Sequence, residues 1–540
     1  MRGSMPETPG TAERQQPEAA EAEGCPVDTF EPNVWYKGKK RKRCGRPPYS
    51  APEGVDKRPV CLMHSRDPNK DNDAFQQEFE RILEEAGEGE ANFTLFVFPR
   101  ADYAGREFKA RCIFGDATFT QRANFIGATF TQEADFTRAT FTQWANFRGA
   151  TFTERADFSE ATFTQRAGFS EATFTGEANF GGATFTQWAN FVLATFTQKA
   201  NFSVTKFTQM AHFNFAKFTQ EAGFQWATFT QGAHFNCATF TQAAAFFNAT
   251  FTQLANFGRA RFSGEATFWK TTFRNDGEGV GPVFSEARFE KPERVVFYGN
   301  YLGQVLFHNC DVSKVEFSNV EWRKRKNGKR MVFEEVVSLE HKAASAEALN
   351  PPEGSADERN YGLIAELYQQ LKKNFDDRRD YWTAGDFHYG EMEMKRVSSP
   401  RSNRVLRWLH RSLGLAAWYK YASEYGESYK RPAVWLGIFL LLFMVAYPDV
   451  GLQRNDGIPT PTSEIHYKNF FQFLEAHPKG AWAFFGHSLM TALSVMALQR
   501  EVEYQPVYPW GRPLLTVFEL VLSYTLIALF LLAVRRQFRR

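Results

Sequence analysis

Ala117–Arg138 reads ATFTQRANFIGATFTQEADFTR, one eleven-residue phrase stated twice, and the chain repeats that phrase with little variation over Phe114–Phe273. The phenylalanines of this stretch are separated alternately by six and five residues. A short fixed period is the signature of a solenoid. Plain steps of five continue on both sides, over Phe93–Ile113 and Phe297–Trp322, so we predict that the repeat covers residues 91–322.

An eleven-residue period is also typical of right-handed coiled coils, but the spacing excludes a helix here. Steps of five and six residues turn an α-helix by about 140° and 240°, so the phenylalanines would not share a face. In an extended chain, the Ala two residues before each Phe points the same way as that Phe, and the Thr, Asn or Asp between them points outward. Two phrases, or 22 residues, then form one coil of a square β-solenoid in which each inward Phe stacks on another one coil away. The predicted core stack is Phe119, Phe130, Phe141, Phe152, Phe163, Phe174, Phe185 and Phe196.

The unit A-[TND]-F-x-x, for example Ala128–Gln132, resembles the Phe-centred pentapeptide repeat. The resemblance implies a right-handed quadrilateral β-helix with Phe and the preceding Ala facing inward. This chain departs from the plain repeat by one extra residue in every second unit, such as Arg122, Glu133 or Trp144. We therefore expect coils of 22 residues with bulges on two opposite faces.

The segment before the repeat carries a group of metal-binding side chains. Residues 1–24 are rich in Pro, Glu, Ala and Gly and are predicted to be a disordered tail. Residues 25–90 contain Cys25, Cys44, Cys61 and His64. Three thiolates and one imidazole, two of them in a Cys-x-x-His pair, form a donor set typical of structural zinc. The alternative is a set of free thiols, because the other spacings are long.

A helix is predicted between this segment and the repeat. Asp73–Ala86 places Phe75, Phe79, Ile82 and Leu83 on one helical stripe. We expect this helix to cap the open first coil, since the terminal faces of a solenoid need covering.

The region after the repeat changes from basic and polar to apolar. Residues 323–358 are predicted to be a basic hairpin, turning at Asn327-Gly328, followed by a linker. Residues 359–430 are predicted to be helical, and within them Asn403–Leu413 has the basic amphipathic composition of a helix on an anionic membrane surface.

Residues 431–540 are predicted to form a membrane domain. Ala433–Tyr447 with its flanks, and Pro513–Val534, are each long enough to span a bilayer. Basic residues lie before the first span and after the second, so the positive-inside rule places both termini and the solenoid in the cytoplasm. Because the Cys/His segment resembles the leader of some bacterial pentapeptide-repeat proteins, we expect the bacterial inner membrane.

The segment between the spans, residues 482–498, is apolar but short, and is predicted to be re-entrant. The order of span, short helix and span resembles the pore domain of two-transmembrane potassium channels. This resemblance implies a homo-oligomer, with Thr491, Ser494, Met496 and Glu519 lining the pore. The filter departs from the family, because Met496–Leu498 stands where Gly-Tyr-Gly would be, so potassium selectivity is not expected.

Composition and motifs restrict the function further. The formal net charge is only +3, which indicates no specific nucleic-acid partner. The sequence shows no nucleophile–base constellation and no phosphate-binding loop, so we do not expect an enzyme. Two hypotheses remain. The first is a membrane-anchored scaffold whose cytoplasmic rod recognises an unknown protein, and the second is an oligomeric, channel-like protein gated by its cytoplasmic domains.

Overall fold

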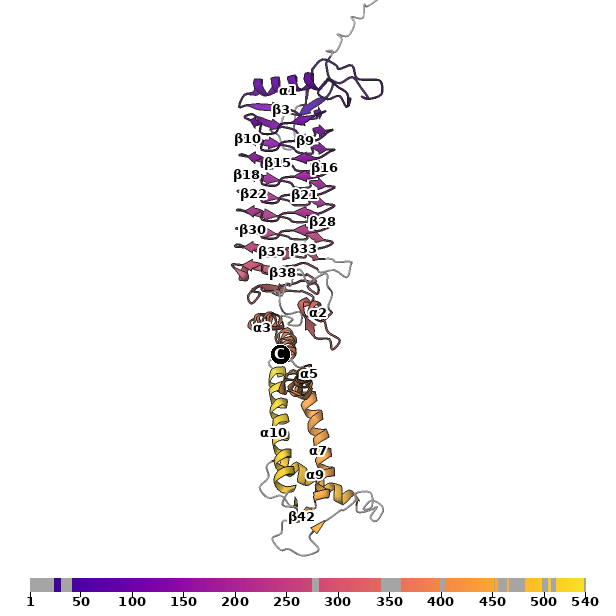
Figure 1. Ribbon diagram of the computed structural model, residues 1–540, viewed down its shortest axis with the longest axis vertical. Coiled ribbons are helices and arrows are strands. Elements are labelled where there is room, and N and C mark those ends of the chain that lie inside the picture. Colours follow the sequence, from indigo (N-terminus) through magenta and orange to yellow (C-terminus); the bar gives the residue numbers. More distant parts are fainter. Residues whose placement is uncertain are drawn as a thin grey trace, which may run out of the picture. The chain divides into compact units, whose positions relative to one another are not determined.

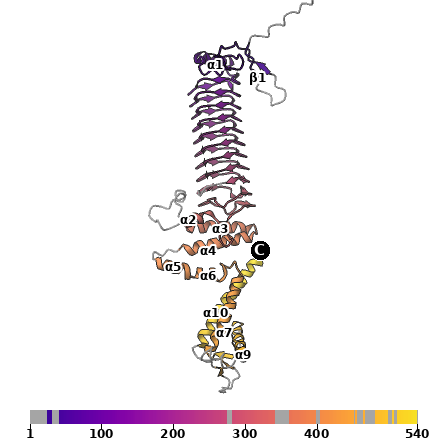
Figure 2. The same cartoon turned by 90° about the vertical axis from the view of Figure 1, so that its right-hand side faces the viewer.

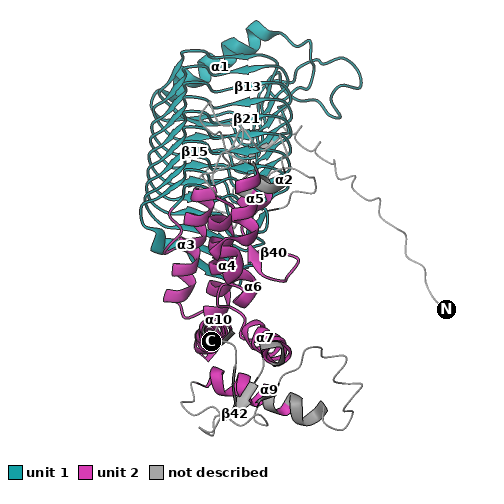
Figure 3. Ribbon diagram, turned by 60° about the horizontal axis from the view of Figure 1, so that its bottom comes forward, with its two compact units in different colours: residues 1–310, 315–321 teal, residues 311–314, 322–540 magenta. Residues whose placement is uncertain are grey.

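The computed structural model describes residues 24–30, 41–273, 281–340, 361–398, 404–450, 452–454, 464–465, 481–497, 504–506 and 511–538. The chain forms two compact units (Figure 3). Unit 1 comprises Met1–Cys310 and Val315–Glu321, and unit 2 comprises Asp311–Lys314 and Trp322–Arg540. The predicted tail up to residue 23, and residues 341–360 of the predicted linker, lie outside the described residues.

Unit 1 is a parallel β-solenoid, drawn in Figure 1 as a stack of short strands. Each coil contributes one strand to each of four sheets, and each strand pairs in parallel with its equivalent in the coils before and after it. In the regular part the partners are 22 residues apart, as in Thr129 with Thr151 and Phe130 with Phe152. The predicted fold and coil length are confirmed.

The four sheets differ in the repeat position that they contain. The first sheet consists of β3 (Glu90–Asn92), β7 (Arg111–Ile113), β11 (Ala134–Asp135), β15 (Ala156–Asp157), β19 (Ala178–Asn179), β23 (Ala200–Asn201), β27 (Ala222–Gly223), β31 (Ala244–Ala245), β35 (Ala266–Trp269), β38 (Val295–Tyr298) and β39 (Glu316–Ser318). The second consists of β4 (Val97–Phe98), β8 (Thr118–Phe119), β12 (Thr140–Phe141), β16 (Thr162–Phe163), β20 (Thr184–Phe185), β24 (Lys206–Phe207), β28 (Thr228–Phe229), β32 (Thr250–Phe251) and β36 (Thr272–Phe273). The third consists of β5 (Ala101–Asp102), β9 (Ala123–Asn124), β13 (Ala145–Asn146), β17 (Ala167–Gly168), β21 (Ala189–Asn190), β25 (Ala211–His212), β29 (Ala233–His234) and β33 (Ala255–Asn256). The fourth consists of β6 (Glu107–Phe108), β10 (Thr129–Phe130), β14 (Thr151–Phe152), β18 (Thr173–Phe174), β22 (Thr195–Phe196), β26 (Lys217–Phe218), β30 (Thr239–Phe240), β34 (Arg261–Phe262) and β37 (Arg288–Phe289).

The core of the solenoid consists of columns of stacked phenyl rings. The predicted core residues are all buried and fall into two columns on opposite sheets. In the column on the second sheet, Phe119 and Phe141 have ring centroids 4.6 Å apart and planes within 4°. In the column on the fourth sheet, Phe152 and Phe174 are 4.9 Å apart and within 3°. The Ala two residues before each Phe is also buried, so both inward positions were predicted correctly.

The corners explain how 22 residues make a square coil. Two opposite corners, after the second and fourth sheets, contain the extra residue of the repeat, for example Arg122 and Glu133. At each of the other two corners one residue has a left-handed backbone conformation. Gly127 and Gly149 occupy it with φ of 62° and 63°, but Val204 does so as well with φ of 61°. A β-branched residue is strained in this region, because its Cβ approaches the following carbonyl oxygen.

The last coils are less regular. Residues 274–280, in the predicted glycine-rich interruption, lie outside the described residues. After them the solenoid resumes, with Arg288 paired to Arg261 and Val295 paired to Ala266. A short 3₁₀ helix, Pro292–Arg294, precedes β38, and the last strand of the solenoid is β39.

Helix α1 (Asn72–Ala86) covers the first coil, as predicted. The carboxylate of Asp71 caps its N-terminus by accepting hydrogen bonds from the amides of residues 73 and 74. Phe79 is fully buried, with its ring centroid 4.5 Å from that of Phe93 and 4.9 Å from that of Tyr103. The helix thereby extends the aromatic column beyond the first coil.

Unit 2 begins with a hairpin and a helical pair. The hairpin of β40 (Arg323–Lys324) and β41 (Arg330–Met331) turns at Gly328, as predicted. The next helix, α2 (Phe333–Glu340), lies in the segment predicted to be a linker. Helices α3 (Tyr361–Asp377) and α4 (Tyr381–Val397) pack against each other within the region predicted to be helical. Arg325 joins these elements, because its guanidinium donates to the Glu335 carboxylate at 2.5 Å and to the Tyr368 hydroxyl at 3.0 Å.

Short helices α5 (Arg404–Leu413) and α6 (Leu415–Ser423) lead into a second helical group. This group contains α7 (Lys430–Val450), α9 (Ala481–Met496) and α10 (Gly511–Phe538). It also includes a small antiparallel sheet of β42 (Leu452–Arg454), β43 (Glu464–Ile465) and β44 (Tyr504–Pro506). Among the described residues, two helical stretches are long and apolar enough to cross a membrane, Lys430–Tyr447 and Leu514–Phe538.

Candidate metal centre and binding surfaces

The strands β1 (Asp28–Phe30) and β2 (Arg41–Arg43) bring two of the predicted ligands together. They pair antiparallel, and the pairing continues beyond the strands. The amide of Cys25 donates to the carbonyl of Arg46 at 2.8 Å, and the amide of Cys44 donates to the carbonyl of Val27 at 2.9 Å. Cys25 and Cys44 therefore lie side by side although they are far apart in sequence.

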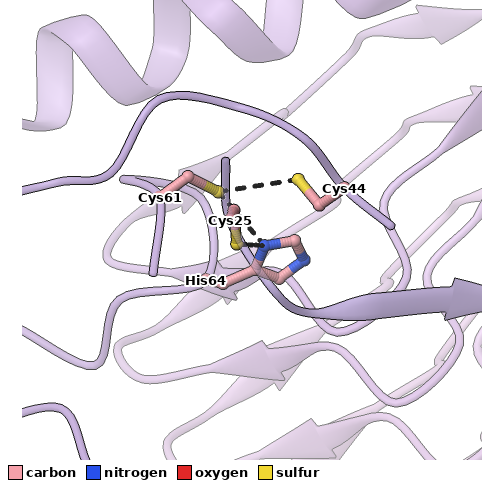
Figure 4. Close-up of side chains that lie close together, drawn as sticks. All are labelled: Cys25, Cys44, Cys61 and His64. Carbon is pink, nitrogen blue, oxygen red and sulfur yellow. Dashed lines mark hydrogen bonds between the residues drawn. The ribbon is translucent and has the colours of Figure 1, made fainter. Parts of the chain in front are cut away.

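A tight turn supplies the other two ligands. The amides of His64 and Ser65 both donate to the carbonyl of Cys61, at 3.0 and 2.9 Å, which brings the Cys61 thiol and the His64 ring to the same side. The four ligand atoms, one from each residue, lie within 4.8 Å of one another (Figure 4). Cys25, Cys61 and His64 are buried, and Cys44 is partly exposed. Together Cys25, Cys44, Cys61 and His64 could hold a metal ion.

Neighbouring groups orient the His64 ring and lower the pKa of one of the thiols, and both effects favour cation binding. The other imidazole nitrogen of His64, Nε2, lies 3.3 Å from the carbonyl of Thr94, which orients the ring and directs Nδ1 toward the thiols. The hydrogen bond with the Cys61 thiol lowers the pKa of the Cys44 thiol. The Arg46 guanidinium, which donates to the Cys44 sulfur at 3.3 Å, also lowers it. The quartet thus favours a thiolate, the form of cysteine that binds metals.

One residue beside the cluster was missed by the sequence analysis. Lys70 is 2% exposed, and its ammonium group donates to the carbonyls of Leu62 and Ser65 at 2.8 and 2.9 Å. It donates also to the carbonyl of Val97 in the first coil, at 2.5 Å. Lys70 therefore fastens the turn that carries Cys61 and His64 to the solenoid. Its position in a polar run gave no sign of burial.

The predicted pore residues have different environments in the helical group. Glu519 on α10 and Thr491 on α9 are buried, whereas Ser494 and Met496 on α9 are partly exposed. The Glu519 carboxylate accepts a hydrogen bond from the hydroxyl of Tyr447 on α7. This bond joins the two candidate spans inside one chain. The assignment of the four residues to a pore stays a prediction.

The surface of the solenoid carries a row of aromatic side chains, which we call the aromatic ladder: Trp226, Phe247, Trp269 and Tyr298. Neighbouring ring centroids are 5.9, 5.5 and 5.2 Å apart, and each pair meets edge to face. Trp226 is 58% exposed and Trp269 is 44% exposed. This row was not predicted from the sequence. The spacing of 22 residues between Phe247 and Trp269 was the signal that could have revealed the row.

Four parallel sheets, inward Ala–Phe pairs and coils of 22 residues define the class of this domain as a quadrilateral β-solenoid. The family model described as "Pentapeptide repeats (9 copies)" matches residues 107–151, 147–195 and 158–206, so this part of the solenoid is built from pentapeptide repeats. No curated protein and no solved structure matches the chain. The resemblance of the C-terminal region to potassium-channel pore domains rests on the sequence pattern alone.

Proposed function

We propose that this chain is a membrane-anchored scaffold, in which the pentapeptide-repeat rod binds a protein partner through the aromatic ladder. The observation that carries this proposal is the exposure of Trp226 and Trp269 within one contiguous row. Large apolar side chains that are exposed together favour a partner that covers them. Trp and Tyr are also the residues that most often dominate binding energy at protein interfaces. The proposal gives the chain no catalytic role.

The anchor is formed by α7 and α10. Only 17% of the first candidate span and 22% of the second is buried, whereas a core helix of a soluble protein would be mostly buried. The exposed side chains include Val434, Leu441, Val517 and Leu531, which lipid would cover. With basic residues before α7 and at the end of α10, the positive-inside rule favours cytoplasmic termini and a cytoplasmic rod at the bacterial inner membrane.

The scaffold proposal is tested by site-specific photocrosslinking in cells. A photoreactive phenylalanine analogue replaces Trp226 in one variant and Gln231, on another corner of the same coil, in the control. We expect one protein to crosslink at position 226 and not at position 231. The purified partner should then lose at least tenfold in affinity for the chain with Trp226→Ser and Trp269→Ser. Equal crosslinking at both positions, or unchanged affinity, would refute the proposal.

We further propose that the Cys/His quartet holds one zinc ion. Zn–S and Zn–N bonds of about 2.3 and 2.0 Å give a tetrahedron with edges of about 3.8 Å between sulfurs and about 3.5 Å between sulfur and nitrogen. The sulfurs of Cys44 and Cys61 are 3.8 Å apart, and the Cys25 sulfur is 3.5 Å from the His64 Nδ1. The Cys61 sulfur lies closer to this nitrogen, at 3.1 Å. A bound zinc would tie the β1–β2 ribbon to the turn that contacts the first coil.

Metal analysis of the purified full chain tests this assignment. We expect one zinc per chain, and none after Cys61→Ser. The control is Cys237→Ser, which removes a free cysteine of the solenoid and should leave the zinc content unchanged. A metal-free chain purified in the absence of chelators would contradict the proposal.

The channel-like alternative remains a second candidate because α9 packs against both candidate spans. Ala492 of α9 is buried in one cluster with Phe443 and Tyr447 of α7. The alternative requires several copies of the chain and predicts currents in planar bilayers that change with Glu519→Gln. A monomeric protein without conductance would refute the channel-like alternative, and only the anchor-and-scaffold proposal would remain.

A further inference from the structure

Helices α5 and α6 leave a large apolar surface uncovered. Eight of their large side chains are exposed, and Leu415, at 90%, is the most exposed of them. They are Val405, Leu406, Trp408, Leu409 and Leu413 on α5, and Leu415, Trp418 and Tyr421 on α6. Only Gly414 separates the two helices, so these side chains belong to one continuous element, which we call the α5–α6 hairpin. A soluble surface rarely exposes so many large apolar residues in so short a segment.

Two cationic side chains of the hairpin, Arg411 and Lys420, contact α4 instead. The Arg411 guanidinium donates twice to the carbonyl of Val397 at the end of α4, at 2.8 and 3.1 Å. The Lys420 ammonium donates to the carboxylate of Glu393, also on α4, at 3.1 Å. Because α4 contacts the cationic side, the apolar side chains face away from it.

The hairpin lies where the two candidate spans have their basic ends. The indole of Trp435 in α7 donates to the carbonyl of Tyr421 at 3.3 Å, and the Arg536 guanidinium of α10 donates to the carbonyl of Tyr425 at 2.9 Å. Figure 2 shows α6 beside the ends of α7 and α10, with α5 continuing from α6 to the side within this unit. The exposed apolar surface is therefore continuous with the part of the spans that would enter lipid.

The charges at this level indicate which lipid covers the hairpin. Lys430, Arg431 and Arg535 are exposed beside it on the ends of the spans. Basic residues that border an apolar surface bind the headgroups of anionic phospholipids.

From these observations we propose that the α5–α6 hairpin lies in the plane of an anionic leaflet, with its apolar face at the boundary between headgroups and acyl chains. The proposal rests on the proposed function, because it requires that α7 and α10 span the membrane. It adds a second lipid contact, which would fix the direction in which the helical pair α3–α4 leaves the membrane surface.

Tryptophan fluorescence of the full chain in lipid nanodiscs tests the proposal. The emission of the chain with Trp408→Phe and Trp418→Phe is subtracted from that of the parent, so that the difference belongs to the two hairpin indoles. The discs contain phosphatidylcholine with or without phosphatidylglycerol, brominated either near the headgroup or near the end of the acyl chain. We expect bromine near the headgroup to quench the difference emission more strongly, and quenching to increase with phosphatidylglycerol.

Resistance of the chain to alkaline extraction from membranes separates this proposal from the anchor itself. A chain that resists extraction but shows no quenching would overturn the hairpin proposal and leave the anchor intact. A chain that is extracted would overturn both. Stronger quenching by bromine at the chain end would refute the interfacial depth, and equal quenching without phosphatidylglycerol would refute the preference for anionic lipid.

Discussion

Replacement of Phe174 by Ala tests whether the phenyl columns hold the solenoid together. Phe174 is fully buried, and its ring centroid lies 4.9 Å from those of Phe152 and Phe196 and 5.9 Å from that of Phe180. Removing a buried Phe costs about 3–5 kcal/mol through lost transfer energy and the remaining cavity, and each lost ring pair adds about 0.5–1.5 kcal/mol. Because neighbouring rings on both sides are fixed by their own coils, the cavity cannot close easily. We expect a loss of about 5 kcal/mol.

Hydrogen exchange measured by mass spectrometry is the appropriate assay, because a solenoid can open in part. Amides of residues 147–200 should exchange at least about 1,000-fold faster, since each 1.4 kcal/mol of opening free energy is a factor of ten. Amides of residues 101–124 should change little. The control is Gln165→Ala, an outward residue of the same region, which should be nearly neutral. Unchanged exchange in 147–200 would refute the role of the stack, and uniform acceleration throughout the solenoid would refute the restriction to neighbouring coils.

Three further changes test other features of unit 1. Val204→Gly should raise the free energy of unfolding by about 1 kcal/mol in denaturant titration. The substitution relieves left-handed backbone strain of about 1–2 kcal/mol, and the greater chain entropy of Gly in the unfolded state offsets part of this gain. Gly182→Val, at the equivalent position one coil earlier, should lower the free energy of unfolding. Lys70→Met should leave three buried carbonyls without their donor and accelerate hydrogen exchange across residues 61–98 by about 100-fold; unchanged exchange would contradict the fastening role. Burial lowers the pKa of His212 and His234, so the unfolded chain binds more protons, and stability should fall as the pH drops through about 6.5 and be constant above it. His234→Asn should weaken this pH dependence, and an unchanged profile of stability against pH would contradict the role of the buried histidines.

The solenoid was predictable because every repeat carries the same short pattern of inward and outward residues. The spacing of the phenylalanines specifies the coil length, and Ala two residues before Phe specifies the inward face. The cap was predictable for a similar reason, since Phe75 and Phe79 fall on one helical stripe. In both cases the pattern lies within a short segment and needs no knowledge of distant contacts.

Other features depend on contacts that the sequence does not reveal. Cys25 and Cys44 could be named as ligands, but the β1–β2 ribbon that brings them together spans residues without a clear strand pattern. The bond between Tyr447 and Glu519 joins two helices that are apolar on nearly all sides, so no hydrophobic periodicity indicated which of their faces pack together. The left-handed corners were missed because residues such as Val204 avoid that conformation when the rest of the coil does not impose it.

Because each coil consists of two equivalent half-coils, the number of half-coils determines both the distance and the relative direction of two features on the solenoid surface. Deleting 22 residues, for example residues 150–171, would remove one full coil and move the aromatic ladder closer to the Cys/His quartet, by about 4.8 Å, on the same side. Deleting only eleven residues, 150–160, would preserve the Ala–Phe pattern but shift everything beyond it by half a turn. The ladder would then point in the opposite direction relative to the quartet. A deletion of one whole coil therefore changes the distance alone, whereas a deletion of half a coil reverses the direction and changes the distance by half as much.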